Sequence, residues 1–178
     1  MPFADPEAKI RLMFMDEAAF GRISEPSSCW APSGVRPVIP CQMVREYMYA
    51  FGAVDPHSGD DCFIIAPKCN TEWTNLFLNE LSIKFKDDYI LLSMDNAGWH
   101  KSKGLKIPEN IRPCYIPPRT PEMNPIEQIW KEVRKRGFKN KLFETINCVV
   151  DKLCETLNSL SNQTIMSITG RDWIVQMF

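Results

Sequence analysis

Three carboxylates stand where a sheet could bring them together: Asp16, Asp95 and Glu127. Asp16 closes an apolar segment that starts at Ile10, and Asp95 closes another that starts at Tyr89. Sites in α/β sheets are usually assembled at strand ends. Oxygen-only ligand sets suit hard cations such as Mg²⁺ or Mn²⁺, and three carboxylates can hold two such ions for an in-line phosphoryl displacement. For any single acid, however, a solvated position at a strand end is the commoner situation.

Glu127 lies in a segment that favours a sharply defined helix start. Asn124 is a good N-cap and Pro125 suits the first helical position, which puts Glu127 at the third. Glu127 could therefore be a capping-box acid that supports its own helix. This role is compatible with metal binding, because a fixed helix start aims the side chain reproducibly. Glu127, Lys131 and Arg134 share one helix face, where two cations could accompany a DNA backbone.

The basic residues are concentrated in one part of the chain, although the net charge is −1. Residues 101–141 contain eleven Lys or Arg and four acids, which gives +7 there and −8 elsewhere. Segregated positive charge is typical of a surface that contacts phosphates, although a solvated helix face explains it equally well. The expected DNA-backbone contacts are Arg119, Lys131, Arg134, Lys135 and Arg136.

Two polar residues, Asn96 and His100, follow Asp95 closely. They could orient bound water or DNA, or Asn96 could close a turn and His100 cap a helix. We expect both to support the site and do not expect His100 to bind metal directly. Trp30 lies in a proline-rich region. It could stack on a base, but a tryptophan in this setting more often packs against a sheet edge.

The elements that must position these residues follow from hydrophobic periodicity. Strands are expected at 10–16, 47–54, 62–66, 89–94 and 111–116. Helices are expected at 71–85, 125–135 and 143–157, with a weaker helical segment at 161–177. Residues 24–40 are rich in Pro, Ser and Gly and predict turns around short strands. This order predicts an α/β fold in which helices pack on the faces of a mixed sheet.

Composition limits the class of protein. The 178 residues fit one domain, 1–178, and 44% hydrophobic residues are ordinary for a soluble globular protein. No stretch approaches the ~20 apolar residues that span a bilayer, and no secretory signal is present, so we expect an intracellular protein without a membrane partner. The seven cysteines form no C-x-x-C pair. They predict reduced core thiols, and neither a zinc site nor a disulfide framework.

Taken together, the motifs resemble the DDE transposases of the mariner superfamily, in particular its bacterial insertion-sequence branch. The matching segments are Met15-Asp16-Glu17, Trp30-x-x-x-Gly34-x-x-Pro37, Asp95-Asn96-Ala97-Gly98-Trp99-His100 and Pro118-Arg-Thr120-Pro121-Glu-Met123-Asn124-Pro125-Ile126-Glu127-Gln128-x-Trp130. They occur in the family's order over most of the chain, and the last segment is long and highly specific.

The resemblance implies a ribonuclease-H-like fold of the α/β class, with a mixed five-stranded sheet, its second strand antiparallel, flanked by helices. It implies that Asp16, Asp95 and Glu127 are catalytic and bind two divalent ions, usually Mg²⁺, with Mn²⁺ as a substitute. One ion would activate water for hydrolysis at the transposon end. The freed 3′-hydroxyl would then attack target DNA, typically at a TA dinucleotide. The implied partners are transposon-end and target DNA, and a second copy of the chain in a homodimer on DNA.

Two features depart from the family pattern. The N-terminal helix-turn-helix modules of the family have no counterpart here, so recognition of transposon ends is expected to be weak. Thirty-one residues separate Asp95 from Glu127, slightly fewer than in the family, which suggests a shortened loop near 101–110.

The leading hypothesis is an active metal-dependent polynucleotidyl transferase and endonuclease, located in the cytoplasm of a bacterium in association with DNA, or in the nucleus of a eukaryotic host. The alternative is a catalytically inactive, transposase-derived DNA-binding or assembly protein. Another ribonuclease-H-like nuclease, such as a junction resolvase, is disfavoured by the Asn-Pro-Ile-Glu segment.

Overall fold

Five strands form one mixed sheet in the computed structural model, which describes residues 9–117, 120 and 123–175. The strands are β1 (Lys9–Ile23), β2 (Met43–Val54), β3 (Asp61–Ala66), β4 (Asp88–Met94) and β5 (Ile111–Tyr115). Their order in space is β3-β2-β1-β4-β5. β2 runs antiparallel to β1 and β3, whereas β4 is parallel to β1 and β5. The predicted α/β class, with its mixed five-stranded sheet and antiparallel second strand, is confirmed.

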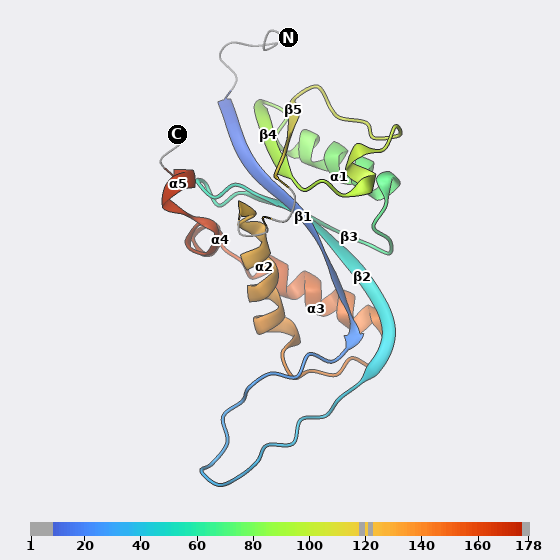
Figure 1. Cartoon of the computed structure of the whole chain (residues 1–178), viewed down its shortest axis with the longest axis vertical. Helices are drawn as coiled ribbons and strands as arrows, with labels where there is room; N and C mark the ends of the chain where they lie inside the picture. Colours follow the sequence, from blue (N-terminus) through green and yellow to red (C-terminus); the bar gives the residue numbers. More distant parts are fainter. Residues whose placement is uncertain (1–8, 118–119, 121–122, 176–178) are drawn as a thin grey trace.

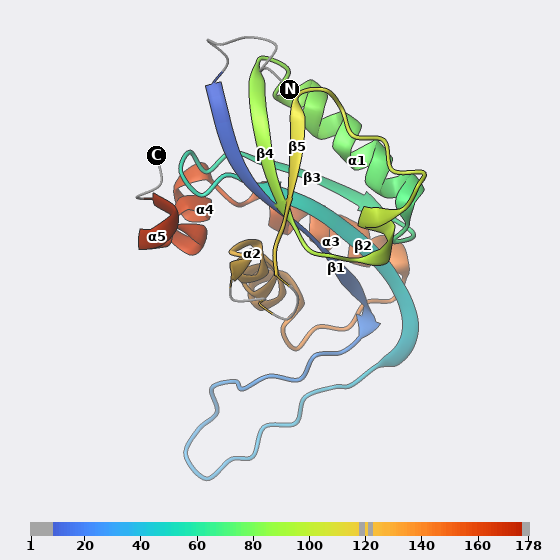
Figure 2. The same ribbon diagram turned by 45° about the horizontal axis from the view of Figure 1, so that its top comes forward.

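Helices cover both faces of the sheet (Figures 1 and 2). α1 (Thr71–Lys84) and the short 3-10 helix η1 (Gly98–Lys101) lie together on one face. α2 (Ile126–Val133) and α3 (Ile146–Asn158) lie on the other, where α4 (Asn162–Thr169) packs against α2; α5 (Asp172–Val175) follows α4. A π-helical turn, η3 (Arg134–Phe138), extends α2. Asn70 caps α1, because its side chain accepts a hydrogen bond from the Trp73 amide.

Strand alternation divides the core into two clusters. Met13 and Met15 of β1 pack with α1 residues such as Phe77. Phe20 packs in the other cluster, with Trp130 of α2. Successive side chains of a strand point to opposite faces, so Asp16 belongs to the α2 face and Glu17 to the α1 face.

β1 does not end at Asp16, so that prediction was wrong. The strand continues to Ile23, and Asp16 pairs with Gly52 of β2 in mid-strand. β4 is shorter, and its last pair with β1 joins Phe14 to Ser93. β1 can carry an acid at this level because β4 no longer runs beside it there.

The segment between β1 and β2 is a long loop that projects from the body of the molecule (Figures 1 and 2). Residues 24–42, all described, contain no strand, so the predicted short strands are absent there. Trp30 is fully exposed, so it does not pack against a sheet edge as the commoner alternative required. The loop is tied to the body where the Ser27 amide donates to Asn140 Oδ1 (2.8 Å).

The seven cysteines, all within the described residues, are free thiols. Only Cys62 is buried and Cys69 half-buried. Burial raises the pKa of the Cys62 thiol to about 11. The other five cysteines are exposed, so the prediction of core thiols was wrong for them.

None of the helices in the described part of the chain combines the length and the apolar character needed to cross a bilayer.

Candidate active site

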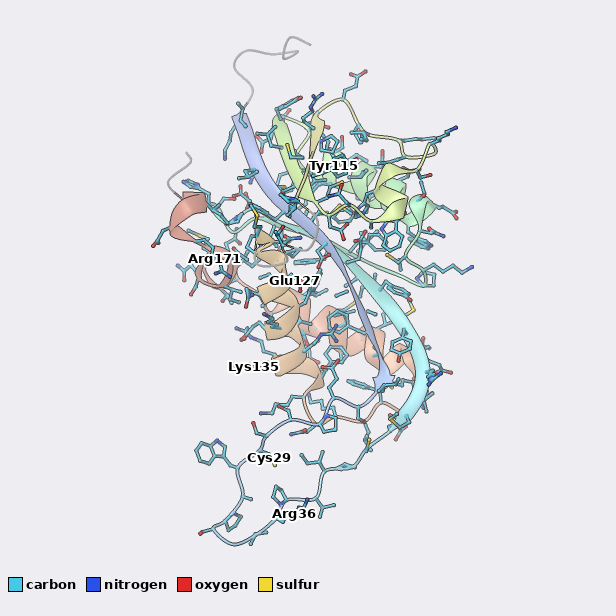
Figure 3. All side chains as sticks on the ribbon, viewed as in Figure 1. Cys29, Arg36, Tyr115, Glu127, Lys135 and Arg171 are labelled. Atoms are coloured by element: carbon cyan, nitrogen blue, oxygen red, sulfur yellow. The ribbon has the colours of Figure 1, made fainter. Side chains whose placement is uncertain are left out.

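The three predicted acids come from three separate elements that meet at one end of the β1–β4 pair. Asp16 lies in mid-β1, Asp95 directly follows β4, and Glu127 lies in the first turn of α2. The β1–β4 register, continued two residues past the Phe14–Ser93 pair, matches Asp16 with Asp95. Figure 3 shows Glu127 near the start of α2, beside the path of β1.

The charges of neighbouring acids act on Asp16 and on Cys69. Burial, followed by the charges of Glu127 and Glu17, raises the pKa of Asp16 to about 7. Burial, followed by the charges of Glu17, Asp16 and Asp95, raises the pKa of the Cys69 thiol to about 12. Negative charge therefore accumulates around Asp16, which is the situation that a bound cation relieves.

Asp16 is oriented from the α2 side. The Trp130 Nε1–H group donates a hydrogen bond to Asp16 Oδ2 at 2.9 Å. Gly52, the β2 partner of Asp16, leaves room for this indole, because a Cβ atom there would lie 2.7 Å from Trp130 Cη2. A glycine opposite the acid thus allows α2 to reach it.

Asp95 is held on one side and open on the other. Its Oδ1 atom accepts from the Ala97 amide (2.9 Å) and from His100 Nδ1 (2.8 Å). The Asp95 side chain remains 53% exposed, whereas that of His100 is fully buried. His100 Nε2 bonds to Glu17 Oε1 at 2.8 Å, and the Trp99 indole donates to the same oxygen at 3.2 Å.

The pKa of His100 reflects this bridge between two acids. Burial alone lowers the pKa, but the hydrogen bond to Glu17 and the charges of Glu17 and Asp95 outweigh it, so the pKa is raised above 6.5. Because ionised carboxylates only accept hydrogen bonds, His100 acts toward Asp95 as a donor.

Asn96 and Asn124 stabilise the backbone around the site. Asn96 Nδ2 donates to the Ile116 carbonyl at 2.6 Å and so joins the ends of β4 and β5. Asn124 does not cap α2 through its side chain as predicted. Its Nδ2 donates instead to the Met15 carbonyl at 3.0 Å, on β1 where β4 has ended. Asn124 Oδ1 is buried and has no partner among the described residues.

Because Asn124 does not cap α2 through its side chain, the prediction that Glu127 belongs to a capping box is also wrong. The helix is assigned from Ile126 with Pro125 before it, and no side chain caps its start. Glu127 is thus left half-buried and close enough to Asp16 to raise its pKa.

The predicted DNA contacts differ in their surroundings. Lys131 and Lys135 are exposed along one side of α2 and η3. Figure 3 shows Lys135 closer than Glu127 to the C-terminal end of this helical segment. Arg134 is bound to Glu25 (2.7 Å) and to the Ala19 carbonyl (3.0 Å). Arg136 pairs with Glu132 at 2.7 Å. Arg119 lies outside the described residues.

The arrangement is open rather than closed around an ion. Among the described residues, no group of three or more His, Cys, Asp or Glu side chains is placed to hold a metal ion. Mg²⁺ usually keeps several waters and takes only one or two protein carboxylates together with substrate phosphates. An open set of acids is compatible with that mode of binding.

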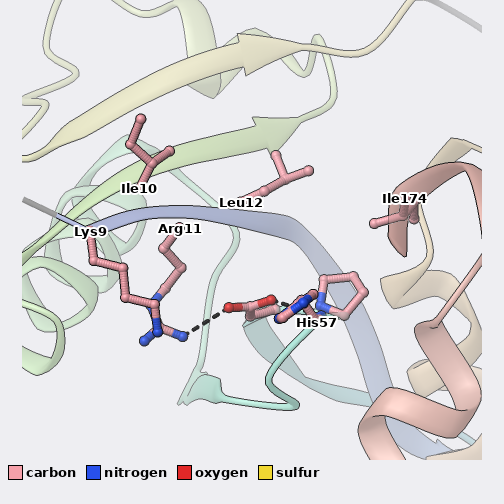
Figure 4. Close-up of a pocket in the computed structure, with 8 residues that line it drawn as sticks. Lys9, Ile10, Arg11, Leu12, His57 and Ile174 are labelled. Atoms are coloured by element: carbon pink, nitrogen blue, oxygen red, sulfur yellow. Dashed lines mark hydrogen bonds and ion pairs between the residues drawn. The ribbon is translucent and has the colours of Figure 1, made fainter. Parts of the chain in front are cut away.

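A pocket elsewhere in the molecule is unrelated to these acids. It lies at the start of β1 and is lined by residues including Arg11, Leu12 and His57 (Figure 4). None of Asp16, Asp95 and Glu127 lines it.

Sequence reasoning missed the residues that hold the acids. In the sequence, Glu17 and Trp130 belong to the motifs of the resemblance, and neither has a predicted role in the site. Alternation along β1 was the available signal for Glu17, because it places adjacent acids on opposite faces. No local signal relates Trp130 to Asp16, 114 residues away.

Comparisons with known proteins identify the family and the fold. A sequence profile described as DDE superfamily endonuclease matches residues 11–149. An uncharacterized protein of Sinorhizobium fredii, y4pE/y4sA, is 37% identical over 130 residues, which cover 71% of this chain and 96% of that protein.

Solved structures show the same fold at low identity. The Mos1 strand transfer complex matches with a TM-score of 0.68 and 11% identity, covering 94% of this chain and 54% of that one. The Mos1 mariner paired-end complex with Mn matches with a TM-score of 0.65 and 12% identity, covering 93% and 53%. The chain therefore spans about half the length of these transposases, and its fold is that of their ribonuclease-H-like catalytic domain. The profile match, which covers more than three quarters of the chain, shows that this chain belongs to the DDE superfamily of endonucleases.

Proposed function

We propose that the chain is the catalytic domain of a DNA transposase, which cleaves and joins DNA strands with divalent metal ions held by Asp16, Asp95 and Glu127. The observation that carries the proposal is the match of residues 11–149 to the DDE superfamily endonuclease profile, in a fold that places Asp16 on β1, Asp95 directly after β4 and Glu127 in the first turn of α2. The acids come from separate elements of the fold. The family to which the chain belongs is described as one of endonucleases.

The residues present fit a hard divalent cation. The donor set is all oxygen, as Mg²⁺ and Mn²⁺ require. Among the described residues, no cation contributes to the charge effects on Asp16, which come from Glu127 and Glu17. Asn124 Oδ1 adds a buried acceptor without a partner among the described residues, next to the Asp16 backbone. When bound, such ions stabilise the attacking and leaving oxygens of an in-line phosphoryl displacement.

The chain's own contribution is to hold these acids in position. Trp130 fixes Asp16 through Oδ2. Ala97 and His100 fix Asp95 through Oδ1, which leaves the exposed Oδ2 side open. The start of α2 presents Glu127 toward Asp16. Preorganisation of this kind lowers the cost of placing reacting groups.

DNA is the proposed substrate, as transposon ends and as target. The Mos1 structures are described as a strand transfer complex and as a paired-end complex with a transposon end, which supports DNA strands as substrates. A homodimer on DNA is part of the proposal. Lys131 in α2 and Lys135 in η3 are the exposed basic residues nearest in sequence to Glu127, so we assign them to phosphate contacts. We place the protein with its DNA, in the bacterial cytoplasm or in a eukaryotic nucleus.

The test is nicking of supercoiled plasmid by the purified chain. We expect cleavage with Mg²⁺ or Mn²⁺ but little with Ca²⁺, whose larger and more flexible coordination suits this chemistry poorly. Asp95→Asn should lower the cleavage rate roughly 10³-fold or more, as when one member of a catalytic unit is removed. DNA binding, measured by fluorescence anisotropy, should be largely kept.

Asp87→Asn is the matched control, because Asp87 is exposed just before β4. It should cleave like wild type. Cleavage by Asp95→Asn at the wild-type rate would refute the assignment. Binding of DNA without any cleavage by the wild-type chain would favour the inactive, transposase-derived protein.

A further inference from the structure

We propose that Glu17 is a positioning residue of this site, which holds His100 so that His100 in turn holds Asp95. The inference rests on the proposed function, in which Asp95 binds metal. Glu17 Oε1 lies 2.8 Å from His100 Nε2, and His100 Nδ1 lies 2.8 Å from Asp95 Oδ1. One imidazole therefore joins two carboxylates that are far apart in the sequence.

The link is buried and fixed at both ends. The side chains of Glu17 and His100 are 6% and 0% exposed. Trp99 Nε1 donates a second hydrogen bond to Glu17 Oε1. The Tyr115 hydroxyl donates to the His100 carbonyl at 2.9 Å and so anchors η1 to β5. A ring held in this way has one orientation.

Asp95 needs such a support because β4 ends at Met94. No strand pairing fixes its backbone, and its side chain is 53% exposed. The bonds to His100 and Ala97 occupy Oδ1, and Oδ2 is left for an ion. Hydrogen-bond partners that orient a metal ligand are typically worth 10–100-fold in metal affinity.

β1 therefore sets the positions of two acids at once. Asp16 projects from one face of the strand, and Glu17, the next residue, reaches Asp95 from the other face through His100. Glu17 is not itself a ligand in this scheme, because its Oε1 atom already accepts two hydrogen bonds in a buried setting. The spacing of Asp16 and Asp95 is fixed by adjacent residues of one rigid strand.

Two substitutions of Glu17 separate the effect of side-chain length from the effect of charge. Glu17→Gln keeps the length and an oxygen that accepts from His100, but removes the charge. Glu17→Asp keeps the charge, but is one methylene too short to reach. Positioning predicts that Glu17→Asp lowers Mn²⁺ affinity about tenfold, while Glu17→Gln stays within about threefold of wild type. A role for charge alone predicts the reverse order.

The measurement is Mn²⁺ binding to the metal-free full chain, by electron paramagnetic resonance of the free ion, alongside the Mn²⁺ concentration that gives half-maximal plasmid nicking. Circular dichroism and thermal melting establish that each variant is folded. Glu46→Asp makes the same chemical change at an exposed glutamate paired with Arg22, and should bind Mn²⁺ like wild type.

His100→Asn breaks the same link independently, because the shorter side chain cannot span both carboxylates. It should lose Mn²⁺ affinity as Glu17→Asp does, and it takes over the test if Glu17→Asp does not fold. The inference is overturned if either folded variant binds Mn²⁺ like wild type, or if Glu17→Gln falls as far as Glu17→Asp. If the wild-type chain binds no Mn²⁺, or Asp95→Asn still cleaves, the proposed function itself fails.

Discussion

A carboxylate in the middle of a strand is the feature that most distinguishes this chain at the scale of single residues. Asp16 sits between two other acids, Glu17 and Glu127, which together with burial raise its pKa to about 7. The folded protein therefore holds the Asp16 proton more tightly than the unfolded chain, where the pKa is near 3.8. Without metal, the contribution of Asp16 to stability falls as pH rises from about 4 to 7, and stays at the lower value above that.

Replacing Asp16 with Asn should remove this loss. We expect metal-free Asp16→Asn to be more stable than wild type by about 2 kcal/mol at pH 8, with the difference shrinking toward pH 4. Urea unfolding in EDTA at both pH values measures it. The Asp87→Asn variant should show no such trend. A stability difference that is the same at both pH values would mean that the ionisation of Asp16 is not its cause.

Which site residues were predictable depended on whether their signal was local. Asp95 and Glu127 sit in motifs whose neighbours, Asn96 and Asn124 among them, are adjacent in sequence. The supporting contacts are not local: Glu17 bonds His100 across 83 residues, and Trp130 bonds Asp16 across 114. Such contacts depend on strand register and helix placement, which composition and periodicity do not specify.

At the scale of elements, β1 extends beyond the end of β4, and side chains bond to the edge of β1 that is left without a strand partner. Asn124 donates to the Met15 carbonyl, and Arg134 donates to the Ala19 carbonyl. These bonds replace the missing strand, since an unpaired strand edge leaves carbonyls to be satisfied. The order and type of the long elements were predicted from periodicity. The end of β1 was not, because a polar residue in a sequence marks a strand end and a half-buried strand interior alike.

Arg134 therefore belongs to the fold more than its position on the α2 face suggested. It lies over the Phe20 ring at 4.6 Å and bonds Glu25 as well as Ala19. We expect Arg134→Ala to destabilise the protein by about 1–2 kcal/mol, through lost stacking and an unpaired carbonyl.

Lys131→Ala is the contrasting variant, because Lys131 is exposed. It should leave stability within about 0.5 kcal/mol but weaken DNA binding and reduce the salt slope of binding by about one. Chemical denaturation and anisotropy titrations at several NaCl concentrations separate the two effects. If the two variants were equally stable, Arg134 would make no special contribution to the stability of the fold.

For the whole molecule, the buried Arg11 side chain ties β1 to the β2–β3 turn and to the start of β4. Arg11 bonds Asp55 (2.9 Å), Asp60 (2.6 Å) and Asp88 (2.7 Å), and Figure 4 shows it reaching the β2–β3 turn from β1. Its guanidinium also lies 4.4 Å from the Phe85 ring centre, just after α1. The site acids are therefore carried by a sheet whose opposite end is fastened by an ion network.

Arg11→Met should destabilise the protein by about 3–5 kcal/mol, because it leaves carboxylates without their cation in a buried setting. The loss depends on pH. Although burial raises the pKa of Asp60, the hydrogen bonds from Ser58 and Arg11 lower it more, so that it ends below 3.8. Stability from this pair is present above about pH 4 and is lost as pH falls through the lower value.

The stability difference between Arg11→Met and wild type should therefore be largest near pH 7 and narrower at pH 3.5, as measured by urea unfolding. Lys84→Met is the control, since its pair with Asp61 spans 3.3 Å and Lys84 is 50% exposed. It should cost less than about 1 kcal/mol. A difference for Arg11→Met that stayed constant down to pH 3.5 would assign the role of Arg11 to packing, because the ion pairs weaken when the carboxylates are protonated.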